Sequence, residues 1–105
     1  MDIVLLYITA PNKAEAEALA APLLAERLIA CANILPEITS IYEWEGKNET
    51  TTETVLLLKT RASLQEAVMK RVEELHPYDC PCIMVLPINA AHPPFAEWIF
   101  SQTKD

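Results

Sequence analysis

Glycine is almost missing from this sequence, which has one glycine and eight prolines in 105 residues. Neither a P-loop nor the G-x-G-x-x-G turn of dinucleotide-binding proteins can be built with a single glycine. The scarcity of glycine therefore excludes the common glycine-rich phosphate-binding loops.

Basic residues are also few, with 8 Lys and Arg against 15 Asp and Glu and a formal net charge of −7. Binding to nucleic acid or to an anionic membrane surface needs basic patches, so neither partner is expected. No apolar run approaches the roughly 18 residues that a membrane-spanning helix requires. The acidic balance is compatible with cationic partners, although in most proteins it serves solubility.

Cysteine occurs three times, an odd number that does not suggest a complete set of disulfides. No charged segment followed by a long apolar stretch precedes the first strand pattern, so no signal peptide is expected. We therefore expect reduced thiols in a cytoplasmic protein.

The length predicts a single domain over residues 1–105, and a hydrophobic content of 51% is enough to build a core. Hydrophobic periodicity predicts strands at residues 3–8, 32–44, 53–61 and 83–86. Helical stripes cover residues 16–23 and 64–75. A short last helix follows Pro94, with three large apolar side chains on one face: Phe95, Trp98 and Ile99.

The order strand, helix, strand, strand, helix, strand is that of the ferredoxin-like βαββαβ fold, which belongs to the α+β class. Right-handed crossovers place both helices on one face of a four-stranded antiparallel sheet. The two middle strands form a long hairpin, with turn residues at 46–48. Alternation along its first strand predicts one shared face for Ile34, Ile38, Tyr42 and Trp44.

The strands at 3–8, 55–58 and 83–86 are apolar on both faces, although two helices cover only one face of a sheet. The short last helix cannot cover the whole of the second face. A second copy of the chain is the expected cover, so the fold is predicted to be oligomeric.

The junction between the second helix and the last strand concentrates reactive side chains. His76 precedes Pro77, which ends the helix. Cys80 and Cys82 flank Pro81, and in an extended segment they point to the same side. Two thiolates placed in this way suit a soft ion such as Cu(I), while packing of both thiols against the core is the alternative.

Four sequence blocks resemble the CutA divalent-cation-tolerance family, in the same order and spacing and over essentially the whole chain. The blocks are Ala-Cys-Ala-Asn-Ile at 30–34, Ser-Ile-Tyr-Glu-Trp-Glu-Gly-Lys at 40–47, Lys-Thr at 59–60, and His-Pro-Tyr at 76–78 with Pro81. The resemblance implies a tight homotrimer of ferredoxin-like subunits whose long hairpin reaches into the neighbouring subunit. It also implies a role linked to copper and other divalent cations, with a copper ion as the one cofactor expected.

The resemblance also supplies candidate site residues. Cys31 matches the family cysteine that is tied to copper. A second set matches positions near a cleft between subunits, namely Lys59, His76, Tyr78 and Trp44. Cys82 departs from the family pattern, which usually has glutamate at this position, so a hard ligand would be exchanged for a soft one.

Each candidate has a structural alternative. Cys31 also suits a small buried position at a helix–strand junction, and His76 suits a helix end, where it complements the helix dipole. Trp44 and Trp98 suit core or interface positions. Four hairpin carboxylates are expected to keep an exposed strand edge soluble, with a weak cation site as the alternative: Glu43, Glu45, Glu49 and Glu53.

Three classes of function compete. The first is a metal-binding protein for cation tolerance, with four candidate ligands: Cys31, Cys80, Cys82 and His76. The second is a trimeric ligand-sensing or scaffold protein similar to the PII regulators. The missing glycine-rich loops disfavour only a nucleotide as its ligand. The third is an enzyme with a cysteine nucleophile assisted by histidine. Because no third orienting group is recognisable, enzymatic activity is not expected.

Overall fold

The order of the elements agrees with the sequence prediction. The computed structural model describes residues 2–105. The strands are β1 (Ile3–Ala10), β2 (Cys31–Trp44), β3 (Lys47–Arg61) and β4 (Ile83–Pro87), and the helices are α1 (Lys13–Ala25), α2 (Gln65–Leu75) and α3 (Pro93–Gln102). A 3-10 turn at Ala62–Leu64 joins β3 to α2. Within this described part of the chain, no helix has the length and apolar character needed to cross a membrane.

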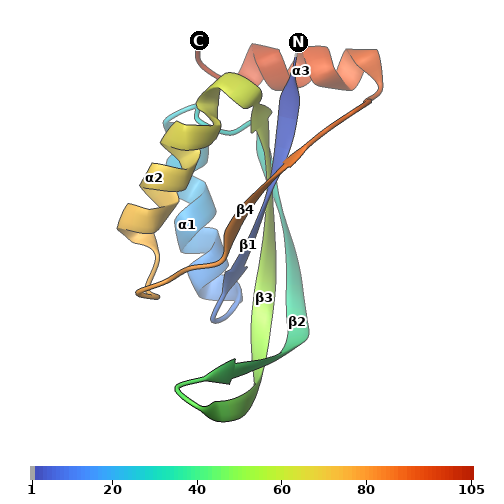
Figure 1. Ribbon diagram of the computed structural model, residues 1–105. Helices are drawn as coiled ribbons and strands as arrows, with labels where there is room; N and C mark the ends of the chain where they lie inside the picture. Colours follow the sequence, from blue (N-terminus) through green and yellow to red (C-terminus); the bar gives the residue numbers. More distant parts are fainter. Residues whose placement is uncertain (1) are drawn as a thin grey trace.

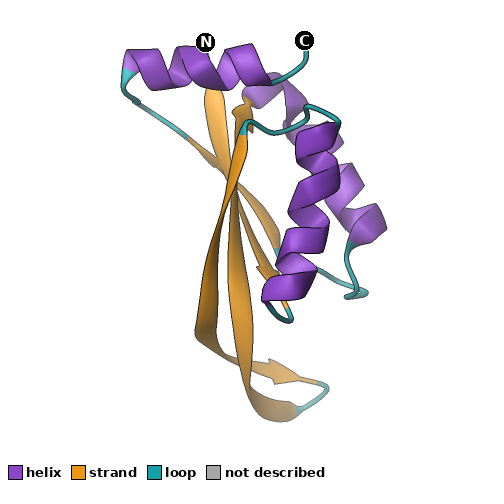
Figure 2. Ribbon diagram, turned by 180° about the vertical axis from the view of Figure 1, so that it is seen from behind, coloured by secondary structure: helices purple, strands orange, loops and turns teal. Residues whose placement is uncertain are grey.

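The four strands form one antiparallel sheet in the order β2-β3-β1-β4. Helices α1 and α2 lie side by side on one face of this sheet, and α3 crosses one end of it (Figures 1 and 2). This arrangement confirms the prediction of an α+β, ferredoxin-like βαββαβ fold with a long hairpin and a short C-terminal helix.

The main core lies between the sheet and the two paired helices. Alternate residues of the central strands point into it and are fully or almost fully buried: Val4, Leu6, Ile8, Leu56 and Leu58. The helices contribute the apolar stripes predicted from their spacing, including Leu19, Leu23, Val68 and Val72. Burial of such side chains is worth roughly 1.5–3 kcal/mol each, so this layer dominates the stability of the single chain.

The hairpin differs from the prediction at its turn. Strand β3 begins at Lys47 rather than at residue 53, because three β-branched threonines at 50–52 continue the ladder with β2. Glu45 and Gly46 alone form the turn, with φ values of 51° and 78°. Two successive positive φ angles are typical of the tight turn that matches the twist of a hairpin.

A bulge in β2 overturns the predicted shared face. The pairing with β3 shifts between Leu35 and Ile38, and Glu37 takes a φ of 61°. A bulge inserts one extra residue and therefore reverses the alternation of side chains beyond it. Ile34 consequently packs against the main core, whereas Ile38, together with Tyr42 and Trp44 beyond it, lies on the opposite face.

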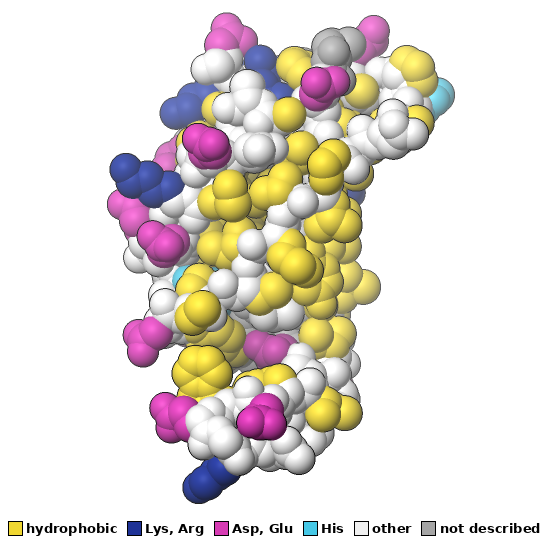
Figure 3. All heavy atoms as spheres, viewed as in Figure 1, with side chains coloured by type: hydrophobic (Ala, Val, Ile, Leu, Met, Phe, Trp, Pro, Cys, Tyr) yellow, Lys and Arg dark blue, Asp and Glu magenta, His cyan; other side chains and the backbone are white. Residues whose placement is uncertain are grey.

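The sheet face opposite α1 and α2, here called the open face, is largely apolar. Leu35, Met84 and Leu86 are 47%, 51% and 42% exposed on it. Figure 3 shows hydrophobic side chains gathered in a strip over the strands, between α3 and the hairpin tip. Helix α3 covers only one end of this face, where Ile3 and Ile99 form a small second core. Most of the open face has no cover within the single chain.

Arg61 at the end of β3 holds α3 in place. Its Nε donates to Thr103 Oγ1 at 2.8 Å, and its Nη2 donates to the carbonyl oxygens of Phe100 and Thr103 at 2.6 and 2.9 Å. The guanidinium also lies over the Phe100 ring, 4.5 Å from its centroid. Arg61 thus satisfies two carbonyl groups at the C-terminal end of α3, and Arg27 satisfies those of Ser101 and Gln102.

Candidate functional site

His76 fastens the loop between α2 and β4 to the end of β1. Its Nδ1 accepts a hydrogen bond from the Tyr78 N–H at 3.1 Å, so the ring proton is on Nε2, which donates to the Thr9 carbonyl oxygen at 2.8 Å. The side chain is buried, with 8% of the residue exposed. Both ring nitrogens are thus occupied by backbone groups, and His76 can bind a metal only by breaking one of these bonds.

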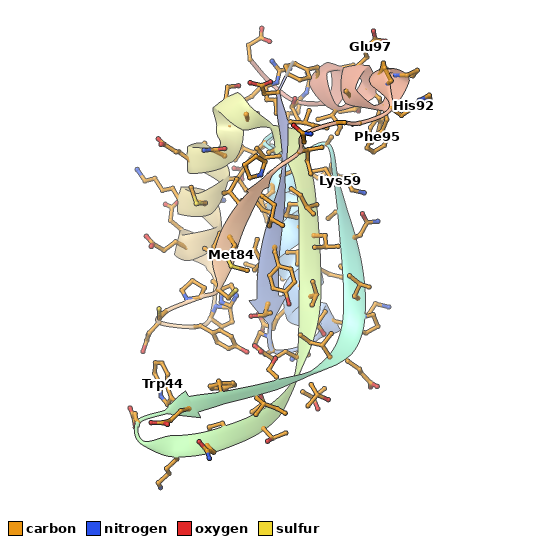
Figure 4. The ribbon with its side chains drawn as sticks, turned by 45° about the vertical axis from the view of Figure 1, so that its right-hand side comes forward. Trp44, Lys59, Met84, His92, Phe95 and Glu97 are labelled. Carbon is orange, nitrogen blue, oxygen red and sulfur yellow. The ribbon has the colours of Figure 1, made fainter. Side chains whose placement is uncertain are left out.

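A cavity of about 390 Å³ lies between this loop and the curled tip of the hairpin. We call it the hairpin pocket. It is lined by Thr9, Tyr42, Trp44, Glu53, Tyr78, Asp79, Cys80 and Cys82. The bulge in β2 brings the face bearing Tyr42 and Trp44 toward the loop. Figure 4 shows the Trp44 side chain rising from the hairpin tip toward the segment that connects α2 to β4.

Glu53 is the buried charged group of the hairpin pocket. It is only 9% exposed, and its Oε2 accepts a hydrogen bond from the Tyr78 hydroxyl at 2.9 Å. Burial and this bond to the carboxylate raise the pKa of Tyr78 to about 12. The expectation that Glu53 is a solubilising surface carboxylate is therefore wrong. Residues two apart in a strand share a face, so the position of Glu53 two residues before the apolar Val55 could have indicated that Glu53 is buried.

Cys80 and Cys82 lie on the wall of the same pocket, and both are free thiols. Cys80 is exposed, whereas Cys82 is half-buried beside Thr9. Burial raises the pKa of the Cys82 thiol, and the nearby Glu53 carboxylate raises it further. The Cys82 side chain is therefore held in its protonated form at neutral pH, which is the opposite of an activated nucleophile.

Cys31 and Lys59 lie away from the hairpin pocket. They are directly paired across β2 and β3, and Lys59 is in register with Leu5, four residues along β1 from the pocket residue Thr9. Four strand residues correspond to about 13 Å. Lys59 donates to Asn33 Oδ1 and lies 5.7 Å from the centroid of the Phe95 ring. Within one chain, the predicted cleft residues Trp44 and Tyr78 thus line the same pocket, whereas Lys59 and His76 are not part of its lining.

Trp44 is 57% exposed in the single chain. Its predicted burial at an interface therefore requires a partner and stays a prediction. Across residues 2–105, no group of three or more His, Cys, Asp or Glu side chains is arranged to hold a metal ion. The four predicted ligands consequently do not form one site within a chain, and the pair Cys80–Cys82 is the part of the set that shares a cavity.

Comparison with known proteins agrees with the motif blocks. The family model described as "CutA1 divalent ion tolerance protein" matches residues 4–102. The chloroplastic protein CutA 1 of Oryza sativa subsp. japonica is 40% identical over 102 residues, which is 97% of this chain and 58% of that protein. The divalent-cation tolerance protein CutA of Citrobacter koseri is 42% identical over 98 residues, or 93% of this chain and 85% of that one. The chain thus spans little more than half of the rice relative.

A solved structure shares the fold closely. The periplasmic divalent cation tolerance protein CutA from Archaeoglobus fulgidus superposes with a TM-score of 0.94 at 40% identity, covering 97% of this chain and 99% of that one. Because the similarity covers nearly the whole chain, the ferredoxin-like topology is that of CutA proteins.

The expectation of a cytoplasmic protein is wrong in the light of these relatives. The rice protein is named for the chloroplast, and the Archaeoglobus protein is named as periplasmic. The expectation rested on free thiols and on the pattern of the first residues. Proteins of one fold and similar sequence occur in different compartments, so neither feature fixes the location.

Three observations indicate the same protein family. They are the order of the sequence blocks, the strand order of the sheet and the family match over residues 4–102. Two sequence relatives at 40% and 42% identity carry the same family name. The chain belongs to the CutA1 divalent ion tolerance protein family.

Proposed function

We propose that this chain serves tolerance to divalent cations by binding copper, held as Cu(I) by the thiolates of Cys80 and Cys82. The observation that carries the proposal is that both thiols line one cavity and neither is in a disulfide. Thiolates select soft ions such as Cu(I), whereas Mg²⁺ and Ca²⁺ need several oxygen ligands. The absence of any group of three donors among residues 2–105 favours an ion that accepts two sulfur ligands.

The other candidate ligands have different places in this proposal. His76 keeps its structural role, because both of its ring nitrogens are engaged by backbone groups. Cys31 would meet the Cys80–Cys82 pair only if a neighbouring copy brought it there, since it is at the opposite end of the sheet. Cys31 is therefore a separate candidate, carried by the family resemblance rather than by the pocket.

The proposed role is binding rather than catalysis. A cysteine nucleophile needs a lowered pKa or a free base beside it. The pKa of Cys82 is raised, and the His76 ring is committed to Thr9 and Tyr78. The alternative of a PII-like sensor or scaffold is not favoured, because the family model and the Citrobacter relative are named for divalent-cation tolerance.

The proposal includes assembly as a homotrimer. The support is the open face, where Leu35, Met84 and Leu86 are each exposed by more than two fifths. An apolar face of this kind is stabilised by burial against another chain. The same assembly would cover the exposed Trp44 ring at the hairpin tip.

Competition titration against a Cu(I) chelator tests the metal proposal. The wild type is compared with Cys31→Ser and with the double variant Cys80→Ser/Cys82→Ser, and Mg²⁺ and Ca²⁺ are titrated in parallel. We expect the double variant alone to lose Cu(I) affinity, by tenfold or more, and we expect weaker binding of the two hard ions.

Two results would contradict this assignment. A loss of affinity confined to Cys31→Ser would move the site to the family position. Equal affinity in all three proteins would make the thiols core and surface residues without a metal role.

A further inference from the structure

The Glu53 carboxylate lacks a cationic partner. It is about nine-tenths buried, and its one hydrogen bond comes from the neutral Tyr78 hydroxyl. The two salt bridges among residues 2–105 join Arg61 to Asp105 and Arg71 to Glu26, so neither involves Glu53. A buried carboxylate without a counter-charge is costly, and a cation supplied from outside the chain would remove this cost.

Aromatic rings form much of the remaining wall around this carboxylate. Tyr42, Trp44 and Tyr78 all line the hairpin pocket, and Tyr42 and Trp44 are 43% and 57% exposed. The face of an aromatic ring attracts a cation, most strongly when the ring is that of tryptophan. A carboxylate that shares a cavity with three such rings suits an organic ammonium group.

The lining also excludes other classes of ligand. It contains two carboxylates, Glu53 and Asp79, and no lysine, arginine or histidine, so an anion would be repelled. A cavity of about 390 Å³ is far larger than one metal ion and is within the range of small-molecule sites. A hydrated divalent ion would gain nothing from the aromatic rings, whereas an ammonium group with an apolar body would contact both kinds of wall.

We propose that the hairpin pocket binds a small organic cation, a primary or quaternary ammonium that carries an apolar body. Glu53 supplies the counter-charge, and the Trp44 ring, covered on its outer side by the proposed trimer, forms a wall of the pocket. The thiols of Cys80 and Cys82 also line the pocket but carry no charge complementary to this ligand, so they are not required for it. The site is thus distinct in its chemistry from the proposed copper pair, although the two share one cavity.

Benzylammonium is a suitable probe, and benzyl alcohol is its neutral counterpart of nearly the same shape. Binding is followed by calorimetry and by the fluorescence of Trp44 in a Trp98→Phe background, since the chain has two tryptophans. We expect saturable binding of benzylammonium that is at least about tenfold tighter than that of the alcohol, because only the cation pairs with Glu53. Tetramethylammonium then reports whether a quaternary head is also accepted.

Glu53→Gln keeps the size of the side chain and an oxygen for the Tyr78 hydroxyl, but it removes the charge. It should weaken benzylammonium about tenfold and leave benzyl alcohol unchanged, while Trp44→Leu should weaken the cation roughly 2- to 30-fold. Glu43→Gln is the matched control, because Glu43 is an exposed carboxylate of the same hairpin outside the pocket lining. It should bind like the wild type.

Crossed variants separate this proposal from the copper proposal. Cys80→Ser/Cys82→Ser should retain benzylammonium binding, and Glu53→Gln should retain Cu(I) binding, which also shows that this variant is folded. Equal binding of the alcohol and the cation would overturn the organic-cation proposal. An unchanged affinity of Glu53→Gln for benzylammonium would also overturn it. So would a wild type without saturable binding, as expected if a side chain of another copy fills the pocket.

Discussion

The Tyr78 hydroxyl donates a 2.9 Å hydrogen bond to Glu53 Oε2, and this bond joins the loop after α2 to the second strand of the hairpin. The two residues are 25 positions apart in the chain. The bond gives the buried carboxylate its only partner among the described side chains and sets the position of one wall of the hairpin pocket. Several properties of the protein therefore depend on this pair.

Removal of the Tyr78 hydroxyl should destabilise the protein. Tyr78→Phe leaves the Glu53 carboxylate buried without a donor, which costs about 1–3 kcal/mol. Urea unfolding at fixed protein concentration measures the change. Tyr42→Phe is the control, because the Tyr42 ring is exposed and its hydroxyl makes no hydrogen bond within residues 2–105. An equal effect of the two substitutions would show that the contact with Glu53 contributes nothing to stability.

Alkaline pH should weaken the fold through the same tyrosine. The pKa of Tyr78 is raised to about 12 in the folded protein, against about 10 for an unfolded tyrosine. The unfolded chain therefore loses this proton first, so the contribution of Tyr78 is complete below about pH 10 and is lost as the pH rises to about 12. Urea unfolding across this pH range should show a smaller decrease in Tyr78→Phe than in the wild type. Parallel decreases would place the effect elsewhere.

Copper affinity should rise with pH. The raised pKa of Cys82 means that Cu(I) must displace a thiol proton, so binding releases protons and becomes tighter as the solution becomes more alkaline. Chelator competition between about pH 6 and pH 9 should give a smaller apparent dissociation constant for Cu(I) as the pH rises. This dependence ends at the pH at which the Cys82 thiol is deprotonated even without copper. The Cys80→Ser/Cys82→Ser variant should lose this dependence. A pH-independent affinity in the wild type would exclude thiolate ligands.

The open face should be an interface between three copies. Sedimentation equilibrium at micromolar concentration should give three times the chain mass for the wild type. Met84→Glu places a charge on the exposed part of the open face and should shift the protein toward smaller species. Leu24→Glu is the control, because Leu24 is similarly exposed, at 53%, but lies on α1. A folded wild-type monomer would remove the trimer from the proposal.

Loss of the Arg61 contacts should loosen α3. Arg61→Lys keeps the charge but cannot reproduce the donors to Phe100 and Thr103, so a loss of about 1–3 kcal/mol is expected. Hydrogen exchange of the amides near residues 99–103 should become faster, while exchange in the main core changes little. Arg71→Lys, in the exposed pair with Glu26, should leave these amides unchanged. Unchanged exchange in Arg61→Lys would mean that the packing of Ile99 and the Arg27 bonds to Ser101 and Gln102 hold the helix without Arg61.

Much of the fold was predictable because its signals are local. The apolar run at β1, the helical stripes of α1 and α2 and the alternation in β2 each need only neighbouring residues. The shared side predicted for Cys80 and Cys82 assumed an extended segment, whereas Cys80 lies in a bend, although both residues line the hairpin pocket. Prediction failed within β2, where Pro36 and Glu37 form the bulge, because alternation assumes an unbroken register.

The sequence by itself determined the element order, the antiparallel ferredoxin-like plan and the family, because these follow from periodicity and from short motifs. The tertiary structure decided the site. The burial of Glu53, the engagement of both His76 nitrogens and the separation of Lys59 from Trp44 depend on contacts between residues far apart in the chain, such as the 67 positions between Thr9 and His76. No local pattern encodes such contacts, since each becomes favourable only after the strands and the loop have packed together.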